Sequence, residues 1–388
     1  MSGTRIEGHC DERFRAVRDA FEASFDRGEV GAAVSVVIDG EPVVDLWAGF
    51  ADAARTRPWE RDTIVNVYST TKGMTAICAH RLVDEGRLDL DEPVATYWPE
   101  FAQQGKQDVP VRMLLSHQAG LCAVDPPLAP EHRYDWERTT DALAAQKPLW
   151  EPGEFHGYHA MTYGHLVGEV VRRIDGRSLG TYFQEEVAAP LHADFHIGFG
   201  EEHDPRCADM IPAPRDPGAP DLFEMLMKSP DSLAAKVFGG STIDSDAVNS
   251  RAWRAAEIPA GNGHGTARAL ARIYGALARG GEIDGVRVLS PEGVERANTE
   301  QVRGEDAVLK PLHTRFGLGF MMTQPMIPLG PNPRAFGHPG AGGSIAFADP
   351  DAKIGFGYVM NQMQMGLTGG AHGFSLIAAL YEAEDLTR

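Results

Sequence analysis

Residues 66–86 read NVYSTTKGMTAICAHRLVDEG, a helical pattern that stops at a glycine and carries Ser69 and Lys72 in its first turn. Residues three apart share one face of a helix, so the ammonium of Lys72 can reach the serine oxygen. A helix start also places backbone N–H groups and the positive dipole end near a developing oxyanion. A desolvated lysine can act as a base. The pair predicts a nucleophile with its base; the alternative is a capping serine and a solvated lysine.

Two other serines match or approach a nucleophile motif. The segment GRSLG (176–180) has the GxSxG pattern, which requires a buried strand before it and a helix after it. The preceding residues, HLVGEVVRRID, have helical periodicity instead, which favours a turn between helices with Gly176 as the cap. The segment GGSIA (342–346) leads into a strand, which indicates a turn. Ser69 is therefore the preferred nucleophile.

Strand patterns lie at both ends of the chain. Two β-rich runs flank Asp39-Gly40, and two more flank residues 350–352, so each end is expected to form a hairpin. The region between them is rich in helical patterns, proline and glycine. The predicted organisation is an α/β domain built from residues 1–87 and 265–388, with an inserted, mostly helical domain formed by residues 88–264.

Composition and charge narrow the class of protein. The 388 residues are 43% hydrophobic and 23% charged, which is typical of a globular protein. The net charge of −19 repels phosphate backbones and anionic lipids, so neither a nucleic acid nor a membrane surface is an expected partner. We expect a cytoplasmic protein, because neither a signal peptide nor a membrane span is visible and the four cysteines are scattered. No metal-binding pattern occurs among the histidines, and no cofactor is expected.

A serine–lysine pair usually needs a third polar group that carries the proton to the leaving group. The segment WEPGEFHGYHAMTYGHLVGE (150–169) offers two tyrosines. Tyr158 follows a Pro-Gly turn and precedes a helical pattern, whereas Tyr163 lies inside that pattern, where packing is the simpler interpretation. Tyr158 is the candidate; its alternative is an interfacial tyrosine with a solvated hydroxyl.

Four segments in this order resemble the serine β-lactamase/penicillin-binding superfamily: YSTTKG (68–73), LLSHQAGL (114–121), PGEFHGYHAMTYGHLVGEVV (152–171) and FGHPGAGGS (336–344). The resemblance is greatest to class C β-lactamases and the β-lactamase-like (family VIII) carboxylesterases. It implies an α+β fold of the β-lactamase/transpeptidase type, in which helices flank an antiparallel sheet. The active site is then expected at the interface of the two domains.

The resemblance also implies roles for individual residues. Ser69 matches the nucleophile of the SxxK motif, Lys72 its base and Tyr158 the tyrosine of the Y-x-N element. A second set takes the place of the K-T-G element and is expected to bind substrate: His338, Pro339 and Gly340. The implied oxyanion hole consists of the backbone N–H groups of Ser69 and Ala341, because Pro339 has no N–H to donate.

Departures from the family pattern bear on the substrate. Ala160 replaces the Y-x-N asparagine that would hold the amide of a β-lactam, and His338 replaces a lysine that would attract a carboxylate. Both changes favour a serine carboxylesterase that hydrolyses small, short-acyl esters through an acyl-enzyme. The alternatives are a β-lactamase, a D-Ala-D-Ala peptidase-like amide hydrolase, or an acyltransferase; His338 could also be structural. His117, in the second segment, is expected to support a helix end away from the chemistry. The sequence does not indicate an oligomeric state.

Overall fold

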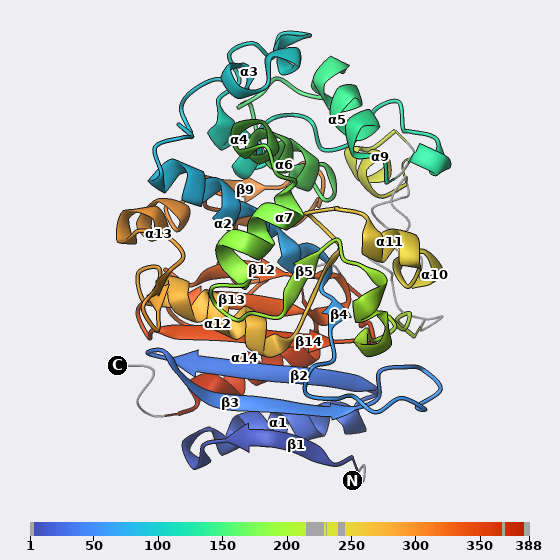
Figure 1. Cartoon of the computed structure of the whole chain (residues 1–388), viewed down its shortest axis with the longest axis vertical. Coiled ribbons are helices and arrows are strands. Elements are labelled where there is room, and N and C mark those ends of the chain that lie inside the picture. Colours follow the sequence, from blue (N-terminus) through green and yellow to red (C-terminus); the bar gives the residue numbers. More distant parts are fainter. Residues whose placement is uncertain are drawn as a thin grey trace.

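The computed structural model describes residues 4–132, 134–214, 229, 231–239, 245–366 and 369–383. Its main feature is a nine-stranded antiparallel sheet that joins the two ends of the chain (Figure 1). The strands lie in the order β1 (Ile6–Cys10), β3 (Glu41–Gly49), β2 (Gly31–Ile38), β14 (Ile354–Met360), β13 (Ile345–Asp349), β12 (Phe336–Pro339), β11 (Met321–Met322), β10 (His313–Phe316) and β9 (Val302–Glu305).

Both predicted hairpins are present at the centre of this sheet. Strands β2 and β3 are joined at Asp39 and Gly40, whose φ angles of 49° and 93° are the left-handed values that a two-residue turn requires. Strands β13 and β14 form the second hairpin, and β14 pairs with β2. The α+β fold with an antiparallel sheet built from both ends of the chain is therefore confirmed.

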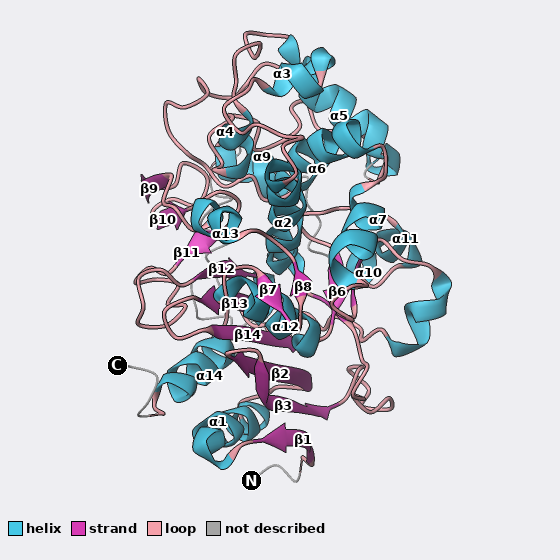
Figure 2. Ribbon diagram, turned by 60° about the vertical axis from the view of Figure 1, so that its left-hand side comes forward, coloured by secondary structure: helices cyan, strands magenta, loops and turns pink. Residues whose placement is uncertain are grey.

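Helices cover both faces of the sheet (Figure 2). Helices α1 (Arg15–Asp26) and α14 (Ala371–Tyr381) contact each other on one face, and α12 (Ala267–Ala278) packs on β14 and β2 on the other. Gly355 permits this approach, because a Cβ there would lie 2.3 Å from the carbonyl oxygen of Ala271. The side of β14 that faces α12 therefore has small residues where α12 comes close.

The remaining described helices lie in the upper half of Figure 1, around and above the end of the sheet that carries β9. They are α2 (Thr71–Asp84), α3 (Val94–Tyr97), α4 (Val111–Leu115), α5 (Trp136–Ala145), α6 (Thr162–Asp175), α7 (Leu179–Phe183), α9 (Leu233–Gly239), α10 (Ser245–Val248), α11 (Arg251–Ala255) and α13 (Pro291–Ala297). Helix α2 is buried along most of its length and contacts α6, α7 and β12. The domain boundaries at 87/88 and 264/265 stay a prediction.

Short strands connect the helices to the main sheet. They form a three-stranded sheet of β4 (Val65–Asn66), β6 (Gly263–Gly265) and β5 (Phe195–Ile197) and a hairpin of β7 (Glu282–Ile283) and β8 (Val286–Arg287). Strand β4 leads directly into the turn that precedes α2. Within the described residues, no helix has the length and apolar character needed to cross a membrane.

Candidate active site

Ser69 lies in a 3₁₀ turn, Tyr68–Thr70, between β4 and α2. Tyr68 has a φ of 46°, a left-handed conformation that is unfavourable for tyrosine and occurs often at functional sites. The hydroxyl of Thr71 donates to the Tyr68 carbonyl at 2.5 Å and accepts from the N–H of Gly263 at 2.9 Å. These contacts hold the turn in place, so that Ser69, which is half-buried, is presented at the start of a buried helix.

The end of strand β12 packs directly against this turn. A Cβ at Gly340 would lie 2.3 Å from the carbonyl oxygen of Val67, so only glycine fits there. The hydroxyl of Ser344 donates to the same carbonyl at 2.8 Å, and it lies 3.3 Å from the hydroxyl of Thr70. Ser344 thus fastens the start of β13 to the turn that carries Ser69, in agreement with a structural role for the GGSIA segment.

Lys72 is fully buried, and its Nζ has three oxygen neighbours. It lies 3.1 Å from Ser69 Oγ, 2.6 Å from the carbonyl oxygen of Ala160 and 2.9 Å from that of Ala260. Burial holds the pKa of the Lys72 ammonium well below its ordinary value. A neutral amine has two N–H donors, which match the two carbonyls, and its lone pair then points toward Ser69. This geometry suits a base.

Tyr158 lies close to both of these residues. The Lys72 Nζ is 4.8 Å from the centre of the Tyr158 ring. Burial raises the pKa of the Tyr158 hydroxyl, while the nearby Ser69 side chain acts in the opposite direction. The phenol is therefore protonated at neutral pH and can act as an acid. The structure brings Ser69, Lys72 and Tyr158 together.

His338, on β12, stacks against the Tyr158 ring with 5.9 Å between the ring centres. Its Nδ1 lies 2.7 Å from the Pro339 carbonyl oxygen, and because a carbonyl only accepts, Nδ1 carries the hydrogen. Burial, together with nearby Lys72, lowers the pKa of His338 to about 3. The imidazole is neutral, and its buried Nε2, an acceptor, has no partner among the described residues. The position of the family lysine thus carries no positive charge.

The two predicted oxyanion donors come from neighbouring turns. Ala341 is the first residue of a 3₁₀ turn, Ala341–Gly343, and Ser69 is the second residue of its own turn. N–H groups in the first turn of a helix have no partner within that helix, which leaves both free to bind an oxyanion. The contact of Gly340 with the Ser69 turn brings the two turns side by side.

The GRSLG serine has a structural role. Ser178 is the N-cap of α7, where its hydroxyl accepts from the N–H of Thr181 and donates to Glu257 Oε1 at 2.5 Å. Gly176 ends α6 with a φ of 93°. The segment is a turn between two helices, as its periodicity predicts.

A second buried lysine shows why low basicity alone does not identify a catalytic group. Lys106 is also fully buried, and burial lowers its pKa to about 8. Its Nζ donates to the carbonyl oxygens of Ala144 and Gln146, at the end of α5. Its hydrogen-bond partners are carbonyls alone, with no serine among them, so Lys106 is a helix cap.

Comparison with known proteins places this arrangement in a family. The model of the Beta-lactamase family matches residues 12–375. The chain belongs to the beta-lactamase family. One relative, "Esterase/beta-lactamase LipL" of Mycobacterium tuberculosis (strain ATCC 25618 / H37Rv), is 39% identical over an alignment of 373 positions, which covers 93% of this chain and 84% of the relative.

Two solved structures are also similar to this chain over their full length. One is described as a family VIII carboxylesterase, with 44% identity and a TM-score of 0.90; 98% of this chain and 100% of that chain are covered. The other is a penicillin-binding protein homolog from Caulobacter crescentus, with 43% identity, a TM-score of 0.89 and the same coverage. The resemblance drawn from the four segments is confirmed, and the chain is a serine hydrolase.

Two features of this beta-lactamase-family site carry no signal in the sequence. The carbonyls of Ala160 and Ala260 that receive Lys72 are backbone groups, which any residue could supply. His117 ends α4 in a left-handed conformation, as expected of a helix end, but its ring also lies 5.2 Å from the Tyr158 ring. The expectation that His117 lies away from the site is therefore wrong, because the chain folds the second and third segments onto each other.

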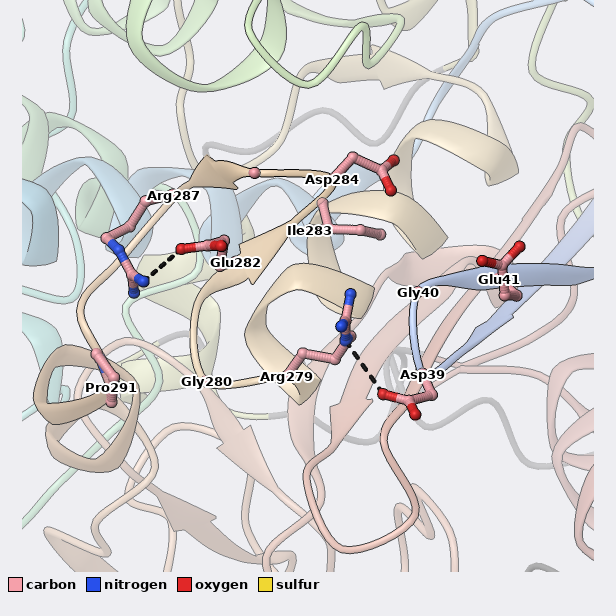
Figure 3. Close-up of a pocket in the computed structure, with 11 residues that line it drawn as sticks. Asp39, Gly40, Glu41, Arg279, Gly280, Glu282, Ile283, Asp284, Arg287 and Pro291 are labelled. Carbon is pink, nitrogen blue, oxygen red and sulfur yellow. Dashed lines mark hydrogen bonds and ion pairs between the residues drawn. The ribbon is translucent and has the colours of Figure 1, made fainter.

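A separate pocket of this beta-lactamase-family protein lies at the turn between β2 and β3, the end of α12 and the β7–β8 hairpin (Figure 3). Four of its charged side chains form two ion pairs: Arg279 with Asp39 at 3.2 Å, and Arg287 with Glu282. The lining shares no residue with the Ser69 site. This pattern is typical of a surface ion-pair network, and we assign the pocket no role.

Proposed function

We propose that the protein is a carboxylesterase that hydrolyses small, short-acyl esters through an acyl-enzyme on Ser69. The observation that carries the proposal is the environment of Lys72. Its two N–H groups are taken by the carbonyls of Ala160 and Ala260, and Ser69 Oγ is 3.1 Å away. A neutral lysine in this position is oriented to remove the serine proton.

The proposed reaction has two halves. Lys72 takes the Ser69 proton as Oγ attacks the ester carbonyl, and the oxyanion is held by the N–H groups of Ser69 and Ala341, each of which contributes about 3 kcal/mol in known oxyanion holes. Tyr158 gives its proton to the leaving alcohol as the C–O bond breaks, and Lys72 returns a proton to Tyr158. Water, activated by the same pair, then attacks the acyl group and releases the acid.

The preference for esters rests on His338 and Ala160. A β-lactam carries a carboxylate, and the neutral His338 offers it no positive charge. Ala160 offers no side-chain amide for the amide group of a β-lactam. A neutral ester needs neither contact, and Pro339 and Gly340 then border the substrate as apolar groups.

Amide hydrolysis is the second candidate, because one relative, LipL, is described as an esterase/beta-lactamase. Initial rates with p-nitrophenyl butyrate and a chromogenic cephalosporin separate the two. We expect kcat/KM to be at least about 100-fold higher for the ester, since two polar contacts to the β-lactam are missing. A higher value for the cephalosporin would overturn the esterase proposal. Methanol added as a competing acceptor would reveal acyl transfer as methyl butyrate.

Replacement of Tyr158 by phenylalanine tests the acid. We expect kcat to fall about 10²- to 10³-fold with little change in KM, because the leaving alcohol loses its proton donor. The matched control is Tyr163→Phe. The centre of the Tyr163 ring is 6.0 Å from Lys72 Nζ, and its buried hydroxyl has no partner among the described residues, so kcat should stay within twofold. Equal losses in both variants would count against the role of Tyr158.

A further inference from the structure

The segment that carries Tyr158 has no regular secondary structure. Residues 151–161, between α5 and α6, form neither helix nor strand, so no ladder of backbone hydrogen bonds fixes the tyrosine. The Tyr158 ring is stacked with the rings of His338 and Phe316, with 5.9 and 6.3 Å between the ring centres. Stacking contacts limit the tilt of a ring more than its sliding within its own plane. The place of the hydroxyl therefore depends on the backbone of Tyr158.

That backbone is anchored by Asp306. The N–H of Tyr158 donates to Asp306 Oδ1 at 3.0 Å, and the same oxygen accepts from the N–H groups of Val308 and Leu309, at 2.9 and 3.0 Å. The other oxygen accepts from the Thr314 hydroxyl at 3.1 Å. The carboxylate is fully buried, and all four of these donors are neutral. Burying a carboxylate costs free energy unless it accepts hydrogen bonds of this kind. The Asp306 carboxylate and its four donors therefore hold one another in place.

A second contact set joins the same two segments. The N–H of Ala307 donates to the carbonyl of His156 at 3.1 Å. The hydroxyl hydrogen of Thr314 is used on Asp306, so His156 Nε2, 2.9 Å from Thr314 Oγ1, is the donor in that pair. The loop after β9 and strand β10 are therefore held to the Tyr158 segment at His156 as well as at Tyr158 N.

We propose that Asp306 is a positioning residue for the reaction, which holds the Tyr158 hydroxyl in line with Ser69 by fixing the backbone N–H of Tyr158. The inference rests on the proposed function of Tyr158 as the acid. A displacement of about 1 Å in a group that transfers a proton can cost about 100-fold in rate. The effect is expected in kcat, because Asp306 touches Tyr158 and its own loop.

The test compares Asp306→Ala and Asp306→Asn with p-nitrophenyl butyrate, after counting reactive Ser69 with a fluorophosphonate probe. The alanine variant should lose about 100-fold in kcat per reactive serine, with KM within threefold of wild type. The asparagine variant, whose amide oxygen still accepts the three N–H groups, should lose only three- to tenfold. Glu305→Gln is the control: Glu305 is the exposed neighbour that pairs with Lys310 at 3.1 Å, and its change should leave kcat unaltered.

A double-mutant cycle separates positioning from stability. In a Tyr158→Phe background, Asp306→Ala or Asp306→Asn should lower kcat by less than twofold, because the hydroxyl that Asp306 positions is absent. The proposal would be overturned if Asp306→Ala lowered kcat by about 100-fold in the Tyr158→Phe background as well. It would also be overturned if the Asp306→Ala single variant kept the wild-type kcat. If the alanine variant does not fold, a wild-type kcat in the asparagine variant would overturn it.

The same variants also distinguish this inference from the proposed function. If wild-type protein does not turn over the ester, the esterase proposal fails, and the rate of phosphonylation of Ser69 by the probe replaces kcat. That rate is expected to fall in the same order, alanine below asparagine below wild type, if Tyr158 is misplaced. Equal labelling rates would overturn the role of Asp306 alone.

Discussion

Changing Ser69 to alanine is expected to lower kcat for p-nitrophenyl butyrate by at least about 10⁴-fold and to abolish the acyl-enzyme. The variant has no side-chain oxygen at position 69 to which the acyl group could be attached. The backbone N–H groups of residue 69 and Ala341 are kept, so a small residual rate is expected. Hydrolysis measured by absorbance gives the rate, and intact-protein mass after brief exposure to ester reports the acyl-enzyme directly.

The matched control for this prediction is Ser178→Ala in the GRSLG segment. Ser178 caps α7 and bonds to Glu257, so its loss should reduce stability slightly and leave turnover per folded molecule unchanged. Turnover at the wild-type rate in Ser69→Ala would contradict the assignment of Ser69 as the nucleophile. Turnover lost in Ser178→Ala alone would transfer that assignment to the GxSxG segment.

Changing Lys72 to methionine is expected to lower kcat by about 10³- to 10⁴-fold. Methionine fills similar space without a lone pair, so Ser69 keeps its position and loses its base. Lys72→Arg should be at least as inactive, because a guanidinium stays protonated and cannot accept the serine proton. Steady-state kinetics over a range of pH checks both variants.

Lys106→Met is the control for this change. Both lysines are fully buried and donate to two backbone carbonyls, so both substitutions should destabilise the fold by a comparable amount. In each variant we expect the free energy of unfolding, measured by urea denaturation, to fall by about 2 to 3 kcal/mol. Only Lys72→Met should lose activity per folded molecule. Equal losses of activity would indicate that Lys72 acts through stability alone.

The pH dependence follows from the lowered pKa of Lys72. Its ammonium is held well below the ordinary lysine value by burial, so the neutral amine is present at a lower pH than in water. Activity should therefore rise with pH as Lys72 loses its proton and remain high in the alkaline range, because the pKa of Tyr158 is raised. Below its folded pKa Lys72 is protonated, which removes the base and lowers the rate. Its contribution to stability falls as the pH drops from the ordinary lysine pKa to the folded pKa, because only the unfolded chain takes up the proton in that range.

Much of the fold and the centre of the site could be predicted from local patterns. The two hairpins have turn residues and β-rich runs, and Ser69 and Lys72 lie one helical turn apart, so both features are encoded within short segments. Tyr158 is the candidate from its place after a Pro-Gly turn, and the resemblance of four ordered segments to a known superfamily matches it to the family tyrosine. The carbonyl partners of Lys72 and the carboxylate of Asp306 had no such signature, since Asp306 follows an exposed glutamate in an ordinary loop and acts on a residue 148 positions earlier.

Strand β2 pairs with β14, and the turn before α2 is held by Ser344 and packed against Gly340. Strands so far apart in the sequence pair slowly. The chain loses conformational entropy when the long loop closes, before the contacts between the strands can compensate for that loss. During synthesis the serine and lysine leave the ribosome long before the strands that support them. The turn that carries Ser69 and Lys72 can therefore reach its folded position only after the C-terminal strands have been made.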